Sequence, residues 1–280
     1  MIKFLLSLIL AALLISPLKV SAQSQNVEIN GDHGKLSAVI QRPDNQKKYP
    51  LVILLHGFTA NKEHALLKTL ADDLESEGIA TIRFDFNGHG QSEGNFQDMT
   101  VLNEIEDAKK VYDYVSKLSE VTSISIAGHS QGGVVTSMVA GELGTDKVKA
   151  IALMAPAAVL REDALRGMLQ GATYDPINPP KYFELNRPGR DSVKVGREYI
   201  KVAQTLPIYE TAIAYQGSAC LVHGTGDIVV PYTYSLRYGR IYANSELHLL
   251  KNFDHGFTQD IAKTAKIVSD YFVRQLKAEK

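Results

Sequence analysis

The chain of 280 residues has a single cysteine and no real excess of either charge, with 30 basic against 31 acidic residues. One cysteine excludes an intramolecular disulfide and any metal site built from several cysteines. Without a basic excess there is no reason to propose a nucleic-acid-binding protein, because such domains usually carry a basic patch or stripe. A hydrophobic content of 45% argues against a disordered chain. The length favours one large domain, or one domain that carries an insertion.

After its first 22 residues the sequence has no apolar run long enough to span a bilayer. The N-terminal segment, residues 1–22, combines Lys3, an apolar stretch over residues 4–15, and small residues at 20–22 (VSA). This is the pattern of a cleaved secretory signal peptide. The alternative is a membrane anchor, but the apolar stretch is shorter than the ~20 residues that a spanning helix needs. We therefore expect a secreted or periplasmic protein of residues 23–280, with no membrane attachment after cleavage.

Along the rest of the chain, short apolar runs alternate with amphipathic stretches. The runs predict strands at residues 51–55, 80–84, 123–127, 150–154, 219–222 and 246–250, with an antiparallel pair at 27–29 and 36–41 before them. Helical spacing predicts helices at residues 66–74, 102–118, 133–140 and 261–272, with Leu102 the first apolar residue of the second stripe. Cys220 falls within a predicted strand and is expected to be buried there. Strands alternating with helices predict an α/β fold with a mostly parallel central sheet flanked by helices.

Residues 157–207 interrupt this alternation. They contain five of the ten prolines and no clear strand or helix period, and they lie between two predicted strands. A long surface loop is the alternative, but unstructured loops of this length are rare in compact domains. We therefore predict an inserted lid across one edge of the sheet.

Residues 128–132 (GHSQG) follow a predicted strand and precede a predicted helix. In that setting, G-x-S-x-G forms a sharp turn that raises the serine hydroxyl above the sheet, where a substrate can reach it. A purely structural turn is the alternative, but the strand–turn–helix context favours Ser130 as a nucleophile.

A serine nucleophile needs a base that is oriented by a third group, and in this arrangement the acid and then the histidine follow the serine along the chain. Of the eight histidines, His255 lies between the last predicted strand and the last helix, where the base is expected. His248 within the strand and His223 at a strand end are expected to be structural. Asp227, just beyond a strand, is predicted to accept a hydrogen bond from the Nδ1–H group of His255. Asp254 is the alternative acid, but as the neighbour of His255 it is poorly placed to hold the ring.

Hydrolysis through a tetrahedral intermediate also needs two N–H donors for the oxyanion. Gln131, next to the serine, is predicted to supply one, and the loop at residues 56–58 (HGF) the other, through Phe58. His56 is expected to form structural hydrogen bonds. The alternative for this loop is a plain glycine turn.

These positions, in this order, resemble the α/β-hydrolase superfamily over about residues 36–276. Five segments are similar to those of the bacterial cinnamoyl/feruloyl esterases: residues 56–61 (HGFTAN), 88–94 (GHGQSEG), 128–133 (GHSQGG), 206–210 (LPIYE) and 223–227 (HGTGD). Gly226 departs from that family, whose members often have aspartate before the triad acid. The resemblance implies a lid over the acyl pocket, with Asp163 and Tyr199 at the phenolic hydroxyl of the substrate and Gln170 as a further substrate contact. The alternative is that Asp163 caps a lid helix that starts at Ala164 and that Tyr199 serves only in packing.

The resemblance implies a secreted serine esterase that hydrolyses feruloyl, p-coumaroyl or caffeoyl esters of plant cell walls through an acyl-enzyme, with no metal or organic cofactor. The expected partner is a small aromatic ester or a feruloylated oligosaccharide; a homodimer is possible. A general short-chain esterase or a monoacylglycerol lipase is an alternative, although either would favour a more apolar lid than one carrying Asp163, Gln170, Tyr174, Tyr182 and Tyr199. A ligand-binding protein on an inactive hydrolase scaffold is the non-enzymatic alternative, which the complete set of Ser130, Asp227 and His255 disfavours.

Overall fold

An eight-stranded sheet forms the centre of the molecule in the computed structural model, which describes residues 23–44, 46–187 and 189–277. The predicted signal peptide, residues 1–22, lies outside the described residues. In chain order, the strands are β1 (Gln23–Asn30), β2 (Lys35–Arg42), β3 (Tyr49–Leu55), β4 (Ala80–Phe84), β5 (Val121–His129), β6 (Ala150–Met154), β11 (Ser218–Gly224) and β12 (Ser245–Leu250).

The strand order across the sheet is β1-β2-β4-β3-β5-β6-β11-β12. The β1–β2 and β2–β4 pairs are antiparallel, and every other pair in this sheet is parallel. The predicted α/β class, with its antiparallel opening pair and mostly parallel sheet, is confirmed.

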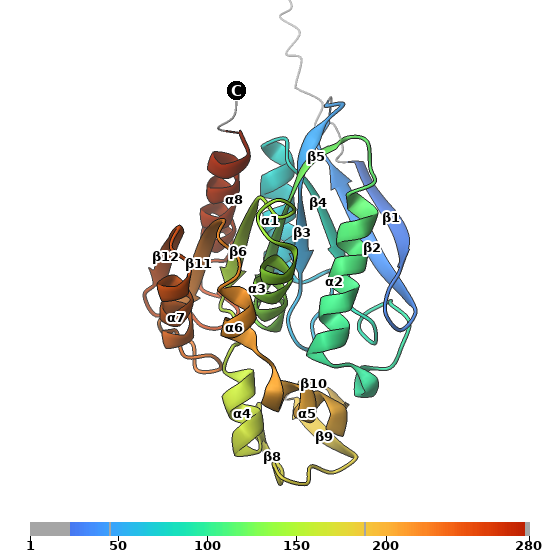
Figure 1. Ribbon diagram of the computed structural model, residues 1–280, viewed down its shortest axis with the longest axis vertical. Coiled ribbons are helices and arrows are strands. Elements are labelled where there is room, and N and C mark those ends of the chain that lie inside the picture. Colours follow the sequence, from blue (N-terminus) through green and yellow to red (C-terminus); the bar gives the residue numbers. More distant parts are fainter. Residues whose placement is uncertain (1–22, 45, 188, 278–280) are drawn as a thin grey trace, which may run out of the picture.

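Helices cover both faces of the sheet (Figure 1). One face packs against α1 (Ala65–Ser76) and α8 (Ile261–Lys277). The other packs against α2 (Val101–Val115), α3 (Gln131–Leu143), α6 (Ile208–Ala212) and α7 (Thr233–Ile241). The side chains of β3 alternate between the two cores, which explains why that strand is apolar at every position from Leu51 to Leu55. No helix in the described ranges is both long and apolar enough to cross a membrane.

The buried face of α2 differs from the predicted stripe. Leu102 is 48% exposed, so its prediction as a buried position is wrong. The helix instead buries two carboxyl side chains, Glu104 and Asp107, alongside Ile105 and Val111. Hydrophobic spacing alone could not indicate these buried acids, because acidic residues are normally assigned to the solvent side of a helix.

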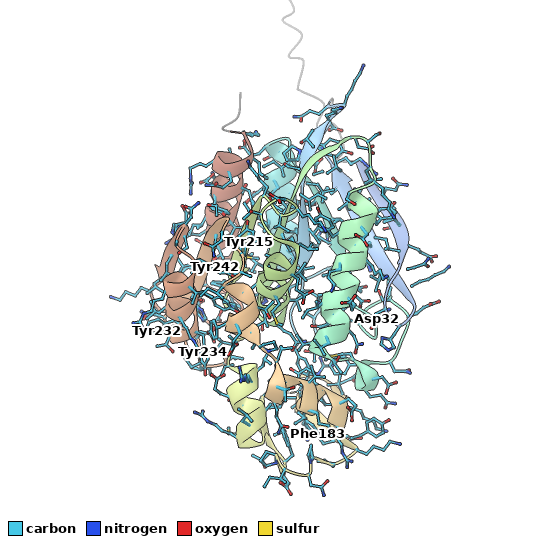
Figure 2. The ribbon with its side chains drawn as sticks, viewed as in Figure 1. Asp32, Phe183, Tyr215, Tyr232, Tyr234 and Tyr242 are labelled. Carbon is cyan, nitrogen blue, oxygen red and sulfur yellow. The ribbon has the colours of Figure 1, made fainter. Side chains whose placement is uncertain are left out.

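The cap, defined here as residues 157–207, lies between β6 and β11 in the chain and at one end of the sheet in space (Figure 1). It contains α4 (Leu160–Arg166), β7 (Met168–Leu169), β8 (Ala172–Thr173), β9 (Tyr182–Arg187), β10 (Arg190–Gly196) and α5 (Arg197–Thr205). The strands form two antiparallel hairpins; Phe183 marks one of them in Figure 2. Asp163 lies inside α4, whose N-cap is Val159, so the alternative that Asp163 caps a helix starting at Ala164 is wrong.

Candidate active site

Ser130 occupies a strained turn between β5 and α3. Its backbone has φ 57° and ψ −122°, a conformation that costs a non-glycine residue about 1–3 kcal/mol and needs support from its surroundings. The Ser130 N–H donates to the Met154 carbonyl at 2.9 Å, and the Ser130 carbonyl accepts from Gly133 at 2.9 Å. A Cβ on Gly132 would lie 2.5 Å from the His56 carbonyl oxygen, so only glycine allows α3 to start this close to the β3 loop.

Ser130, His255 and Asp227 form one line of hydrogen bonds. The Ser130 hydroxyl lies 2.9 Å from Nε2 of His255, and Nδ1 of His255 lies 2.7 Å from Oδ2 of Asp227. The three residues follow β5, β12 and β11, whose carboxyl ends meet at the edge of the sheet that the cap adjoins. In this geometry His255 can take the proton of Ser130 while Asp227 holds the imidazole in the required tautomer.

Asp227 is fully enclosed by donors. Its Oδ1 accepts the N–H groups of Val229 and Val230, both at 2.8 Å. Burial opposes ionisation of Asp227, but hydrogen bonds from His223 and His255 outweigh that effect and hold the pKa of the carboxyl well below its ordinary value. Asp254, the alternative acid, instead accepts hydrogen bonds from the backbone N–H and the hydroxyl of Thr258.

His223 contacts the triad acid directly, although the sequence predicted only a structural role for it. Its Nε2 lies 3.1 Å from Oδ2 of Asp227 and 2.9 Å from the Val230 carbonyl. Because that carbonyl can only accept, Nε2 carries the proton, and Nδ1 accepts the hydroxyl of Ser235 at 2.7 Å. The four-residue spacing between His223 and Asp227 was the available signal.

The loop after β3 packs directly on the nucleophile. A Cβ on Gly57 would lie 2.9 Å from Cβ of Ser130, which brings the backbone of Phe58 close to the site. Gln131 is the first residue of α3, where helix N–H groups have no partner within the helix. His56 supports the loop as predicted: Nδ1 donates to the Gly57 carbonyl at 2.9 Å, and Nε2 accepts from Phe86 at 3.2 Å.

His129 supports the base from behind. It is buried, which holds the pKa of its imidazole well below the usual value, and its Nε2 donates to the backbone carbonyl of His255 at 2.8 Å. The two rings lie 5.0 Å apart. This contact fixes the backbone of the loop that carries His255.

The three cap residues predicted to meet the substrate lie in different environments. Tyr199 is buried; its hydroxyl donates to Oε1 of Gln131 at 2.8 Å, and its ring lies 5.3 Å from that of Phe58. Asp163 is partly buried, which raises the pKa of its carboxyl. Gln170 lies in the exposed turn between β7 and β8. The structure therefore joins Tyr199 to the two predicted oxyanion residues and leaves Gln170 apart from them.

Asp163 lies within electrostatic range of three tyrosines. Its charge raises the pKa of Tyr174, Tyr199 and Tyr234, although burial is the larger cause in each case and brings the pKa of Tyr174 to about 12. Figure 2 shows Tyr234 beside the cap helix α4. Phenolic hydroxyls from the cap and from α7 are therefore within electrostatic range of the Asp163 carboxyl.

One group of described residues has metal-ligand types within reach of one another, and it is remote from Ser130. Cys220, Glu246 and His248 lie at the β11–β12 edge. Glu246 already accepts two hydrogen bonds of 2.8 Å from Arg274. Cys220 is buried, as predicted.

The chain is similar in sequence and in structure to known proteins. A family model described as serine aminopeptidase, S33, matches residues 46–174. The structure of Est1E from Butyrivibrio proteoclasticus with ferulic acid bound is 34% identical, with a TM-score of 0.84 and coverage of 89% of this chain and 98% of that chain. The mitochondrial palmitoyl-protein thioesterase ABHD10 of Bos taurus is 24% identical over 74% of this chain and 67% of its own length.

Other curated relatives match over a shorter length. An uncharacterized 31.7 kDa protein in the traX-finO intergenic region of Escherichia coli is 33% identical over 93 residues, which is 32% of each chain. The chain thus spans about a third of the length of that relative.

Proposed function

Because this chain belongs to the α/β-hydrolase superfamily, as its 34% identity over almost the whole of a solved relative shows, we propose that it is a serine carboxylesterase acting on hydroxycinnamate esters. The observation that carries the esterase proposal is the continuous relay from the Ser130 hydroxyl through His255 to Asp227, at 2.9 Å and 2.7 Å.

The reaction has two halves. The Ser130 Oγ attacks the ester carbonyl while Nε2 of His255 takes the hydroxyl proton, and the N–H groups of Phe58 and Gln131 bind the oxyanion. His255 then protonates the departing alcohol oxygen, which leaves an acyl group on Ser130. A water that gives its proton to His255 then attacks this acyl group. The bond between the acyl carbon and Ser130 Oγ breaks, His255 returns the proton to Oγ, and the acid is released.

Two observations support an aromatic acyl group. The solved relative with 34% identity was determined with ferulic acid bound. In this chain, Asp163 of the cap helix α4 is partly buried, and a carboxylate there can accept a hydrogen bond from a phenolic hydroxyl. A buried phenol without such a partner would lose about 1–3 kcal/mol of binding free energy.

A comparison of wild type with Ser130→Ala tests the proposal. The substrates are methyl ferulate, methyl p-coumarate, methyl caffeate, tributyrin and p-nitrophenyl acetate. We expect a folded variant whose kcat is lower by a factor of about 10⁶, because the three residues act as a unit. A folded Ser130→Ala variant that retains a tenth of wild-type kcat would exclude Ser130 as the nucleophile. Preference for tributyrin over the three aromatic esters would instead favour a short-chain esterase or lipase.

We also propose that the protein is exported and that residues 1–22 are removed. Expression of the full chain in a bacterium, followed by N-terminal sequencing of the processed protein, tests this. Cleavage after Ala22 is expected; an intact N-terminus in the membrane fraction would support an anchor.

A further inference from the structure

Glu104 is a buried carboxyl next to a proposed oxyanion residue, and the reaction above does not use it. Its side chain is on α2 and the residue is 1% exposed. Its Oε2 accepts a hydrogen bond of 2.8 Å from the side-chain amide of Gln131. The other end of that amide accepts the hydroxyl of Tyr199 at 2.8 Å. A single amide therefore joins α2 of the core to α5 of the cap, immediately beside the nucleophile.

Tyr199 contacts both residues whose N–H groups are assigned to the oxyanion. Its hydroxyl reaches Gln131, and its ring packs against Phe58, which in turn packs against Phe96 at 5.3 Å. The position of Tyr199 is therefore transmitted to the two backbone segments that must hold the oxyanion. Small displacements of such N–H donors from the position of the oxyanion lower the rate of reaction.

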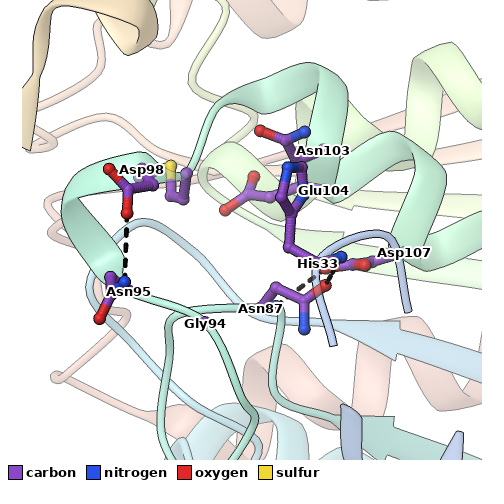
Figure 3. A pocket seen from close by; sticks show the side chains of 9 residues that line it. His33, Asn87, Gly94, Asn95, Asp98, Asn103, Glu104 and Asp107 are labelled. Carbon is purple, nitrogen blue, oxygen red and sulfur yellow. Dashed lines mark hydrogen bonds between the residues drawn. The ribbon is translucent and has the colours of Figure 1, made fainter. Parts of the chain in front are cut away.

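The second carboxyl oxygen of Glu104, Oε1, is buried and has no hydrogen-bond partner among the described residues. Glu104 lines a cavity of about 160 Å³ together with Asn87, Asn103 and Asp107. Figure 3 shows the carboxyl directed from α2 toward Asp98. A carboxylate with one donor is costly in such a place. A carboxylic acid fits better, because one oxygen accepts from Gln131 and the other bears a proton that it can donate into the cavity.

The charges around Glu104 favour the same state. Asp107 lies on the same helix, Asp98 lines the cavity from the 3-10 helix η1 (Phe96–Asp98), and His33 lines it from the turn between β1 and β2. Among the described residues that line this cavity there is no lysine or arginine. Burial is the main cause that raises the pKa of Glu104 to about 8; the Gln131 hydrogen bond lowers it and the charge of Asp107 raises it.

We propose that Glu104 is a positioning residue that acts through the Gln131 side chain to hold the oxyanion donors and to fix Tyr199 of the cap against them. This inference rests on the proposed esterase function. With Glu104 protonated, the Gln131 amide spans the gap between the acid and the Tyr199 hydroxyl. Loss of that proton creates a carboxylate that needs a second donor, which draws the amide away from Tyr199 and loosens the first turn of α3.

Glu104→Gln and Glu104→Ala test the proposal, with Glu106→Gln as the matched control because Glu106 is on the same helix but half-exposed and paired with Lys109. The kcat and KM for p-nitrophenyl acetate are measured from about pH 6 to about pH 10, which brackets the titration of Glu104. Wild type and Glu106→Gln should lose kcat on the alkaline side with a midpoint near the Glu104 pKa of about 8.

Glu104→Gln should lack this alkaline fall and stay within about threefold of wild type at neutral pH, because its carbonyl oxygen still accepts from Gln131. Glu104→Ala should lower kcat about tenfold or more at every pH with little change in KM, since the oxyanion contacts act in the transition state. An alkaline fall that persists in Glu104→Gln overturns the proposal, and so does a folded Glu104→Ala variant with wild-type kcat.

A measurement independent of activity separates this inference from the proposed function. The side-chain amide resonance of Gln131, followed by NMR, should shift with a midpoint near pH 8 in wild type and remain constant in Glu104→Gln. Wild-type protein that hydrolyses no ester would overturn the proposed function, whereas a Gln131 resonance that does not titrate would overturn the role of Glu104 alone.

Discussion

Asp227 receives more hydrogen bonds than are needed to orient one histidine. Two backbone N–H groups bind one of its oxygens, and His223 and His255 share the other. These donors keep a buried carboxylate ionised and fix its plane. His255 consequently meets an acceptor whose position does not depend on the bound substrate.

Replacement of Asp227 by asparagine separates the two candidate acids. Asp227→Asn should lower kcat by a factor of about 10⁴, because an amide at this position favours the wrong tautomer of His255. Asp254→Asn should stay close to wild type, since that carboxylate binds Thr258. Both variants are assayed on p-nitrophenyl acetate after circular dichroism has shown that they fold. If Asp254→Asn were the more damaging change, the acid would have to be reassigned.

Individual contacts at the site were only partly predictable. The order of Ser130, Asp227 and His255 along the chain, each just after a strand, was enough to predict their meeting, because parallel strands end at a common edge. The hydrogen bond between Tyr199 and Gln131 was not predictable, since it depends on how α5 packs over α3. The family resemblance predicted that Tyr199 would contact a hydroxyl of the substrate. In the structure, the Tyr199 hydroxyl donates to Gln131.

At the scale of elements, the cap has a different construction from the sheet it adjoins. The central strands are buried on both faces and are visible in the sequence as apolar runs. In β9, by contrast, Leu185 is buried while most neighbouring side chains are exposed, and β7 and β8 have two residues each. Such strands leave no period in the sequence, which is why the cap was predicted as an insertion without its internal structure.

The cap also gives a test of substrate selection. Asp163→Ala should lower kcat/KM for methyl ferulate about tenfold, through loss of the acceptor for the phenolic hydroxyl. Hydrolysis of p-nitrophenyl acetate should change little, because acetate does not reach the cap. Glu184→Ala, at an exposed position of β9, is the control.

Tyr199→Phe should behave differently from Asp163→Ala. Because the Tyr199 hydroxyl binds Gln131 rather than lying free, its loss should lower kcat for both esters.

For Asp163→Ala, equal losses for both esters would mean that Asp163 supports the fold, and its contact with a phenolic hydroxyl would be excluded.

For the whole molecule, the two buried acids of α2 make stability depend on pH. Burial is the main cause that raises the pKa of Glu104 to about 8 and of Asp107 to about 6. A folded-state pKa above the unfolded value means that the folded protein binds more protons in the interval between them. The contribution of Glu104 to stability therefore declines as pH rises from the ordinary glutamate pKa of 4.5 to the folded-state pKa of about 8.

Urea unfolding across that interval checks this expectation. Relative to Glu104→Gln, wild type should lose free energy of unfolding as pH rises, on the order of a few kcal/mol in total. Glu106→Gln should follow wild type. A constant difference between wild type and Glu104→Gln at all pH values would show that Glu104 is ionised to the same extent in both states.

The attachment of the cap has a consequence for how such a molecule can diversify. The cap follows β6 and is followed by α6, which leads into β11. β6 and β11 pair directly with each other from Ser218↔Ala150 to Val222↔Met154. The sheet is therefore continuous from β6 to β11, and the length of the segment between them in the chain does not affect the strand register. The cap can be exchanged as a cassette: a graft from a relative with another acyl preference should transfer that preference onto an unchanged reaction centre. Tyr199 must be carried over in any such graft, because Gln131 depends on it.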